Sequence, residues 1–245
     1  RPRVLRFRLF LLIQDLIGGT WQPSATDRSW SFPVERIAAA MVVLPVFLQA
    51  PWVRLDPFSA TLFTAVLIGV GLVLHRSRSQ TASDLGSLLV GFSGSWLAGC
   101  IFWGWLRAHP VLHLPIEAFA LPIALGGLNG PWRLAATFYL SSLVGTACTD
   151  LAMAATGVMR FWPSVVTASL DQAPLLLHAA GMQLLTPTPI LLLIAAATAI
   201  VVVSRRLNQR GTGSMASAVL LTTLWVDGLF LLTALIQPSL SGLIE

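Results

Sequence analysis

The chain has no lysine, two cysteines, one tyrosine and few charges, and these shortages restrict what it can be. Charged residues make up 10% of its 245 positions, whereas a soluble domain carries about 25%. Hydrophobic residues reach 56%, and the mean hydropathy is +0.79. This composition excludes an ordinary soluble domain. It predicts an all-α, polytopic bundle in a lipid bilayer, with one transmembrane domain over residues 35–240.

The motifs of nucleotide, phosphate and serine-hydrolase chemistry are also missing. There is no Walker-type loop, no GxGxxG and no G-x-S-x-G. The pI near 10.9 comes from arginines at the ends of apolar runs, so it does not indicate nucleic acid as a partner. Cys100 and Cys148 fall inside apolar runs without metal-type spacing, and we interpret them as buried thiols.

Apolar windows predict seven spans of about 16–26 residues, a length suited to a hydrocarbon core about 30 Å thick. They lie near 37–53, 58–74, 85–106, 111–128, 134–159, 188–203 and 215–236.

Arginines on alternate sides of these spans predict the orientation. Only Arg54, Arg107 and Arg160 fall on the side opposite the N-terminus, and the other twelve fall on the N-terminal side. Basic residues favour the cytoplasmic side, so the N-terminus is expected in the cytoplasm and the C-terminus outside.

Two segments outside the spans have their own patterns. Residues 1–34 begin with four arginines among apolar residues, which predicts a basic amphipathic segment on the membrane surface. Residues 161–187 are apolar but interrupted by Asp171, His178 and prolines. An outer interfacial helix is the preferred interpretation of this stretch, and a re-entrant segment is the alternative.

Three acids lie deep inside the predicted spans: Glu117, Asp150 and Asp227. Each stands ten residues from a polar residue that marks the outer side of its span, Arg107, Arg160 or Gln237, which places all three about 15 Å below that marker. No arginine shares this depth. Carboxylates gathered in a low dielectric cannot all remain ionised, so we expect at least one to be protonated. Intramembrane acids mark proton or cation pathways, although one protonated acid can also simply join two helices.

The fourth span adds further polar groups at this level. His113 stands four residues before Glu117 and shares its helix face. Pro115 and Pro122 remove backbone donors and predict a broken helix. The spacing of His113 and Glu117 also suits metal ligands on one helix face, but no second His-containing pair accompanies them, so no metal site is predicted.

The candidate site follows from these residues. As a hypothesis, Glu117 and Asp150 are the catalytic acids. The binding candidates are His113, Glu117, Thr149, Asp150, Asp227 and Trp96. Thr146 and Thr223 add hydroxyls at about the same depth. Trp96 is open to two interpretations, packing within the bundle or stacking on a flat pigment or quinone. The cofactor is unknown, with chlorophyll or carotenoid as candidates.

Two blocks carry a resemblance to a known family. They read DLGSLLVGFSGSWLAGCIFWGWLRAHPVLHLPIEAFALP from Asp84 to Pro122 and FYLSSLVGTACTDL from Phe138 to Leu151. The chain resembles a family of uncharacterised cyanobacterial integral membrane proteins with a domain of unknown function. It departs from that pattern at Gly94, where a tryptophan is expected, and at 152–154, where aromatics are expected. The resemblance implies a cyanobacterial thylakoid or plasma membrane and supplies no activity.

One function is preferred, mainly on this resemblance, and two alternatives remain open. The preferred function is an accessory or assembly component of a photosynthetic or respiratory membrane complex, with pigment or lipid as its ligand. The second is a small transporter coupled to protons or a cation. The third is an intramembrane enzyme acting on a polyisoprenoid or lipid. The segment Pro115-Ile116-Glu117 is similar to the Pro-x-Glu motif of small membrane-embedded lycopene cyclases, although their second acid is replaced here by Ala118.

Overall fold

The computed structural model describes residues 34–209 and 213–240, and this part of the chain contains helices and no strands. The predicted basic segment at residues 1–34 lies almost entirely outside the described residues. Seven helices are long and apolar enough to cross a membrane, as predicted. Their bounds are Val34–Leu55, Pro57–His75, Gln80–Leu106, Pro110–Gly127, Arg133–Ala155, Pro187–Gln209 and Ser214–Ile236. The chain is therefore an integral membrane helical bundle.

Four of these spans are single α-helices: α4 (Pro57–His75), α8 (Arg133–Ala155), α11 (Pro187–Gln209) and α12 (Ser214–Ile236). The other three change geometry along their length. The first consists of α2 (Val34–Leu44), the π-helical η1 (Pro45–Gln49) and α3 (Ala50–Leu55). The third is α5 (Gln80–Ile101) followed by the π-helical η2 (Phe102–Leu106). The fourth contains η3 (Pro110–Leu112), α6 (His113–Glu117) and α7 (Leu121–Gly127).

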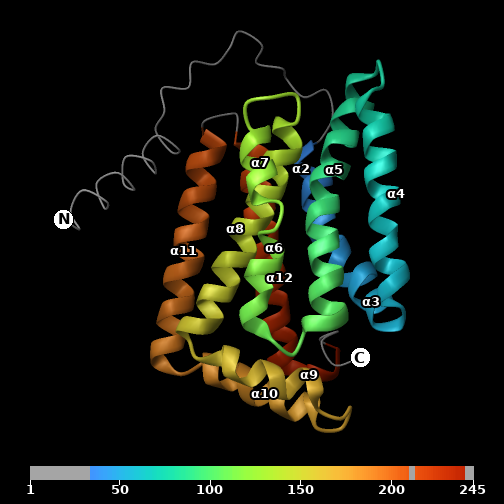
Figure 1. The fold of residues 1–245 in the computed structure, drawn as a ribbon. Helices are drawn as coiled ribbons and strands as arrows, with labels where there is room; N and C mark the ends of the chain where they lie inside the picture. Colours follow the sequence, from blue (N-terminus) through green and yellow to red (C-terminus); the bar gives the residue numbers. More distant parts are fainter. Residues whose placement is uncertain (1–33, 210–212, 241–245) are drawn as a thin grey trace, which may run out of the picture. The chain divides into compact units, whose positions relative to one another are not determined.

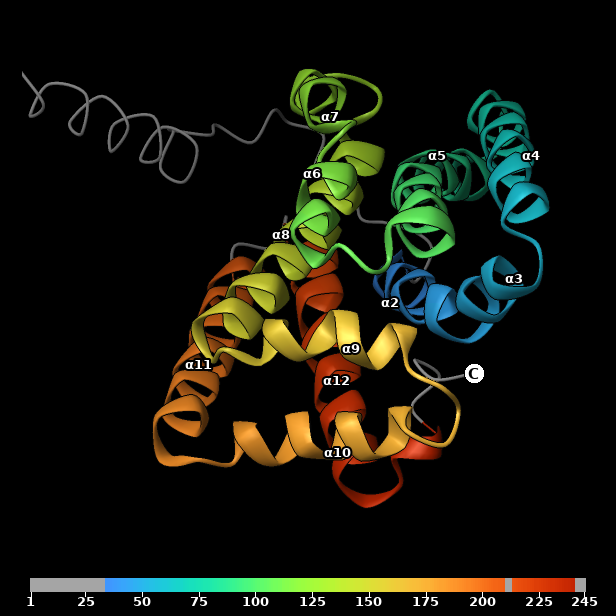
Figure 2. The same cartoon turned by 60° about the horizontal axis from the view of Figure 1, so that its bottom comes forward.

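The spans pack so that α12, the last in sequence, lies among the others (Figures 1 and 2). It contacts α2, α8, α10 and α11, while α5 contacts α4 on one side and α8 on the other. Many outward side chains are large and apolar, as lipid contact requires. On α4, for example, Leu62 and Val73 are exposed.

Small residues allow the closest of these approaches. At Gly91 of α5, an added Cβ would lie 2.4 Å from the carbonyl oxygen of Ala135 on α8. At Gly99, the same addition would lie 2.9 Å from Oε1 of Gln49. These two glycines of α5 therefore admit two different neighbours, a helix backbone at Gly91 and a buried amide at Gly99.

Two predicted ends differ clearly from the structure. The sixth span was expected to end near residue 203, but α11 continues to Gln209. The fifth span was expected to continue to residue 159, but α8 ends at Ala155. Gly157 follows with φ of 73°, a left-handed conformation that glycine adopts without steric cost and that ends many helices. Apolar composition alone continues past this point, so hydropathy could not detect the turn.

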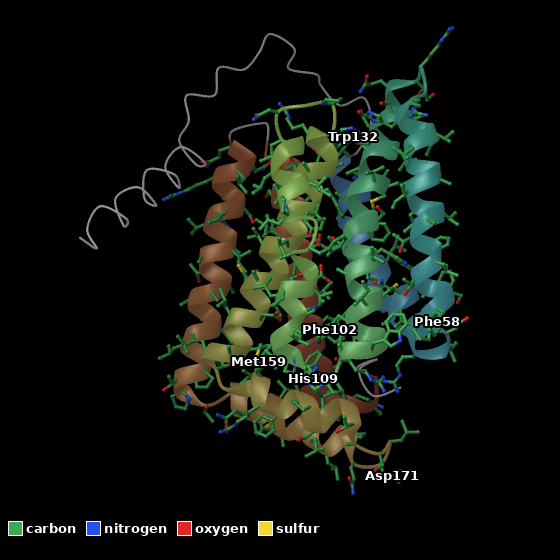
Figure 3. The ribbon with its side chains drawn as sticks, in the orientation of Figure 1. Phe58, Phe102, His109, Trp132, Met159 and Asp171 are labelled. Atoms are coloured by element: carbon green, nitrogen blue, oxygen red, sulfur yellow. The ribbon has the colours of Figure 1, made fainter. Side chains whose placement is uncertain are left out.

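Residues 158–184 form η4 (Val158–Phe161), α9 (Trp162–Thr167) and α10 (Ala173–Leu184). In Figure 1, α9 and α10 lie across one end of the spans, as expected for an interfacial segment, and do not enter the bundle as a re-entrant segment would. Val165, Ala173 and Leu177 form a buried cluster with Ala234 near the end of α12. Trp162 attaches this segment to the bundle because its Nε1 donates to the carbonyl of Arg107 at 2.6 Å. Figure 3 shows Asp171 at this same end.

The connection between the first two spans is a single residue, Asp56, which is exposed. Its carboxylate caps α4 by accepting hydrogen bonds from the backbone N–H groups of Phe58 and Ser59. Hydrogen bonding from the Ser59 side chain, together with these backbone bonds, holds the pKa of Asp56 below its ordinary value.

Candidate functional site

The fourth span is broken, as its prolines predicted, and the break is held by a side chain from another helix. Helix α6 ends at Glu117 and α7 begins at Leu121, with a turn between them. Tyr139 of α8 bridges this turn: its hydroxyl donates to the carbonyl of Glu117 and accepts from the N–H of Ala120 at 3.2 Å. The only tyrosine in the chain therefore satisfies two backbone groups that the break leaves unpaired.

The acids of the three spans lie close to one another. His113 Nδ1 of α6 is 3.0 Å from Oδ1 of Asp150 on α8. Thr149, next to Asp150, donates from Oγ1 to Oδ2 of Asp227 on α12 at 2.6 Å. Asp227 and Asp150 also interact electrostatically. The layer inferred from depth is therefore a connected group in the structure.

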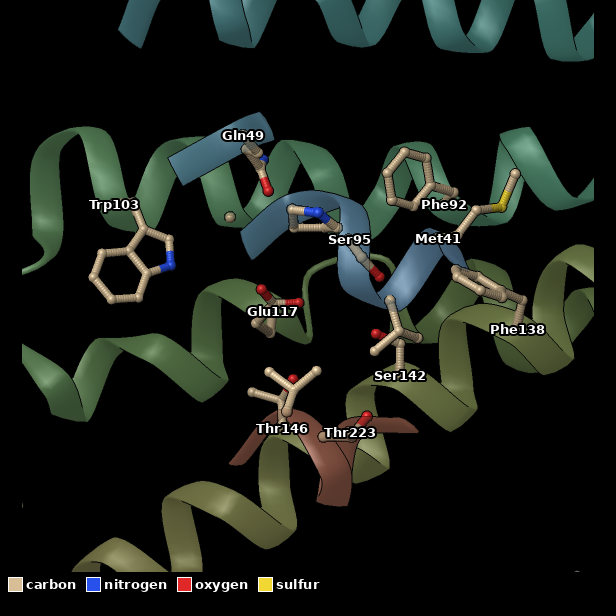
Figure 4. A pocket seen from close by; sticks show the side chains of 14 residues that line it. Met41, Gln49, Phe92, Ser95, Trp103, Glu117, Phe138, Ser142, Thr146 and Thr223 are labelled. Carbon is tan, nitrogen blue, oxygen red and sulfur yellow. The ribbon is translucent and has the colours of Figure 1, made fainter. Parts of the chain in front are cut away.

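Glu117 completes this group and differs from its other members. It interacts electrostatically with both His113 and Asp150, yet none of the described residues donates a hydrogen bond to its carboxyl oxygens. The side chain is only 8% exposed. A buried carboxyl without a donor is costly, and here it faces a cavity (Figure 4).

The cavity has a volume of about 170 Å³ and lies between the first, third, fourth, fifth and last spans. Its polar lining includes Gln49, Ser95, Glu117, Thr146 and Thr223. The rest is mainly apolar and aromatic: Met41, Val42, Pro45, Phe92, Trp103, Phe138 and Val226, with Ser142 and Gly99. Both π-helical segments contribute, η1 through Pro45 and Gln49 and η2 through Trp103. Such wide turns occur frequently at functional sites.

Hydrogen bonding determines which atoms face this space. The Gln49 amide nitrogen donates to the carbonyl of Trp96 at 2.5 Å and to Sγ of Cys100 at 3.1 Å. Both of its hydrogens are thereby used, and Oε1 remains as an acceptor. Thr223 donates to the carbonyl of Val219 in its own helix. Gln49 and Thr223 therefore donate their hydrogens within the protein, and their oxygen lone pairs remain available to a ligand in the cavity.

The structure separates Trp96 from the other predicted site residues. It is buried in an edge-to-face cluster with Trp52, Phe63 and Phe92. Its Nε1 donates to the carbonyl of Ala60 at 2.9 Å. Of the two interpretations of Trp96, packing is the one this geometry supports.

Sequence reasoning missed Gln49, Ser95 and Tyr139. Gln49 carried a signal, because it is a polar residue within an apolar run and stands between Pro45 and Pro51. Tyr139 carried none beyond being the sole tyrosine. The buried Oγ of Ser95 has no hydrogen-bond partner in the described part of the chain and lies at the cavity, which the sequence does not indicate.

The candidate cofactors do not fit this site. A space of about 170 Å³ compares with a 150 Å³ cavity that binds benzene, so a chlorophyll macrocycle or a carotenoid exceeds it. The His113 ring packs on Phe102 at a centroid distance of 4.3 Å. Within the described residues, no group of three or more His, Cys, Asp or Glu side chains has a metal-binding arrangement.

Comparison with known sequence families identifies one match. Residues 38–235 match the family described as protein of unknown function (DUF3120). This region includes the spans that form the cavity, and the chain belongs to that family. No curated protein and no solved structure matches the chain significantly.

Proposed function

We propose that this DUF3120 membrane protein is a small transporter coupled to protons or a cation, with the buried acid group as its coupling site. The observation that carries the proposal is the carboxyl of Glu117, which is buried, lacks a donor among the described residues and faces a cavity with polar and apolar lining. An intramembrane carboxyl that is merely structural would hydrogen-bond a neighbouring helix. One that exchanges a proton or holds a cation needs open space in front of it.

The residues behind Glu117 support a proton path. His113, the first residue of α6, lies one helical turn before Glu117, about 6 Å along the helix axis. Its ring joins Asp150 at 3.0 Å, and Asp150 interacts with Asp227. An imidazole takes up a proton on one nitrogen and releases one from the other, so this pair can pass protons between Glu117 and the bundle end covered by α9.

The test is proton flux in proteoliposomes containing a pH-sensitive dye. A potassium gradient with valinomycin supplies the driving force, and sodium or potassium salts are varied outside. Wild-type protein is expected to carry protons faster than protein-free vesicles. Glu117→Gln and Asp150→Asn are expected to reduce the rate by about 100-fold or more, the loss typical of removing a proton-transferring group. Asp171→Asn is the matched control, because this exposed carboxyl lies outside the bundle. Wild-type flux equal to that of empty vesicles at every pH from about 6 to 8 would refute the proposal.

A second function is favoured by a separate observation on α12. Trp225 lies mid-helix and is 79% exposed, with Leu229, Leu232 and Ile236 along the same face. Tryptophan prefers membrane interfaces rather than the bilayer centre, so a partner helix covering this face would explain its position. This observation supports an accessory or assembly component of a membrane complex. The resemblance noted in the sequence suggests a photosynthetic or respiratory complex in a cyanobacterial membrane. Co-purification in mild detergent, lost in Trp225→Ala but retained in Phe47→Ala, would distinguish it from the transporter.

The enzyme hypothesis gains less support. A cavity that admits a benzene-sized molecule encloses only a short part of a polyisoprenoid. The acid at Glu117 is suitable as a general acid, but the space before it suits a small molecule.

A further inference from the structure

We infer that the cavity binds a small primary alkylammonium ion, with Glu117 as its counter-ion. This inference names the cation class for the proposed transporter and therefore rests on that function. It is supported independently by the charge, the hydrogen-bonding capacity and the shape of the cavity lining.

Charge selects the sign of the ligand. Glu117 is the only ionisable residue among the fourteen that line the cavity. No arginine or histidine lies in the lining to offset a negative ligand. Bringing an anion beside this carboxyl would add repulsion to the cost of desolvation, whereas a cation relieves that cost.

Hydrogen bonding selects the kind of cation. Gln49 has used both amide hydrogens on Trp96 and Cys100, so it offers Oε1 to the cavity. Thr223 has donated its hydrogen to Val219 and offers lone pairs. These two side chains therefore favour a ligand that supplies donors, and a primary ammonium supplies three.

Ser95 provides the independent sign of a missing ligand. Its Oγ is buried and has no partner among the described residues, although it lies at the cavity. A buried unpaired hydroxyl costs free energy, and native structures usually explain such a group by a water, ion or ligand. An ammonium between Glu117 and Gln49 would explain it.

The apolar side of the cavity selects an alkyl chain over a bare inorganic ion. Figure 4 shows Met41, Phe92 and Phe138 together at one side, with Gln49 and Glu117 away from them. A hard metal ion requires a close shell of about six oxygens, and the described acids and histidines form no such group. The volume of about 170 Å³ admits about six non-hydrogen atoms by comparison with benzene. Butylammonium has this size, with a charged head and an apolar tail.

The test is calorimetric binding to the purified full-length protein in nanodiscs. The probes are n-butylammonium, n-butanol and butyrate, three molecules of similar size that differ in charge. We expect measurable binding of butylammonium, weaker binding of butanol and none of butyrate. Glu117→Gln should weaken butylammonium about 10- to 100-fold, the range for losing one charge-assisted hydrogen bond. Asp171→Asn should leave the affinity unchanged.

Ser95→Ala separates a ligand-binding role from a structural one. Because Ser95 Oγ has no partner in the described structure, its removal should leave the midpoint of thermal unfolding unchanged or raised. It should nevertheless weaken butylammonium binding about threefold or more. Ser95→Ala breaks no hydrogen bond of the described structure, so this variant is expected to fold for both measurements.

Three results would overturn the inference. Equal affinity for butylammonium and butanol would show that only the tail is recognised. Butylammonium binding unchanged in Glu117→Gln would place the ligand elsewhere. No butylammonium binding, together with Glu117-dependent proton flux, would refute the ligand class while leaving the proposed transporter intact. Butylammonium binding without proton flux would instead support the site and refute the transporter.

Discussion

The hydroxyl of Tyr139 is expected to stabilise the break in the fourth span, and Tyr139→Phe removes that atom alone. Its two partners, the carbonyl of Glu117 and the N–H of Ala120, belong to backbone that has no helical partner at the turn. Tyr139 is 3% exposed, so water does not readily replace the hydroxyl. Phenylalanine keeps the ring and its packing against Ala136 and Leu143.

The magnitude follows from the two groups that lose their partner. A buried backbone group left unpaired costs about 1–3 kcal/mol. The freed carbonyl and N–H can regain part of this by bonding each other or by local shifts, so we expect a loss of about 2–3 kcal/mol. A loss of this size is large for one substitution and small enough to leave the protein folded.

The assay is reversible unfolding of the purified protein by denaturing detergent, followed by circular dichroism. Thr137→Val is the matched control on the same helix. Its hydroxyl donates only to the carbonyl of Arg133, one turn earlier. That carbonyl also belongs to the α8 backbone ladder, so the control should lose less than about 1 kcal/mol. The position of Glu117 gives a second readout, because butylammonium binding should weaken in Tyr139→Phe and remain normal in Thr137→Val. Equal stability of Tyr139→Phe and wild type would refute the bridging role.

Three further outcomes are expected. Asp150→Asn should reduce the rate of proton flux by a larger factor than it reduces the affinity for butylammonium, because Asp150 pairs with His113 and lies outside the cavity lining. Equal losses in the two assays would contradict this division. Gly91→Ala should destabilise the fold by about 1–3 kcal/mol in detergent unfolding. The added Cβ would lie 2.4 Å from the backbone of Ala135, which, unlike a side chain, cannot turn aside. An unchanged midpoint would exclude this tight contact. Asp56→Ala should lower the midpoint of thermal unfolding at neutral pH, because the helix cap requires the carboxylate. The difference from wild type should shrink as pH falls through the lowered pKa of Asp56. A difference that does not depend on pH would argue against the capping role of the carboxylate.

Ligand affinity should also depend on pH. Glu117 binds an ammonium as a carboxylate, so acidification should weaken butylammonium as protons occupy that group. The titratable groups that act on Glu117 from its surroundings are His113 on its own helix and Asp150 on α8, with Tyr139 packed against the turn. Calorimetry at several pH values in wild type and Asp150→Asn measures the dependence. An affinity that rises on acidification would contradict the assigned role of Glu117.

Much of the fold was predictable because a bilayer imposes a simple requirement. Each span must satisfy its own backbone hydrogen bonds over about 30 Å, so runs of apolar residues mark the helices directly. The prolines of the fourth span likewise predicted a break, because a missing N–H acts locally. The end of α8 was missed because a left-handed glycine interrupts a helix without changing hydropathy.

The candidate site was only partly predictable. Rise per residue placed Glu117, Asp150 and Asp227 at one depth, but depth does not report the direction in which a side chain points. Asp150 and Asp227 belong to a connected group with His113 and Thr149, whereas Glu117 alone faces the cavity. Rotation of each helix about its axis determines this difference.

The sequence by itself determined the membrane class, the seven spans and the broken fourth helix, because each depends on local composition and on backbone donors that are missing locally. Only the tertiary structure decided which acid is unpaired and what it faces. Gln49, Ser95 and Tyr139 come from three different spans. Gln49 and Tyr139 acquire their roles through contacts between residues 19 to 51 positions apart, and Ser95 through its place at the cavity. Such contacts depend on how the helices pack, and packing depends on shape complementarity across the whole bundle rather than on any one segment.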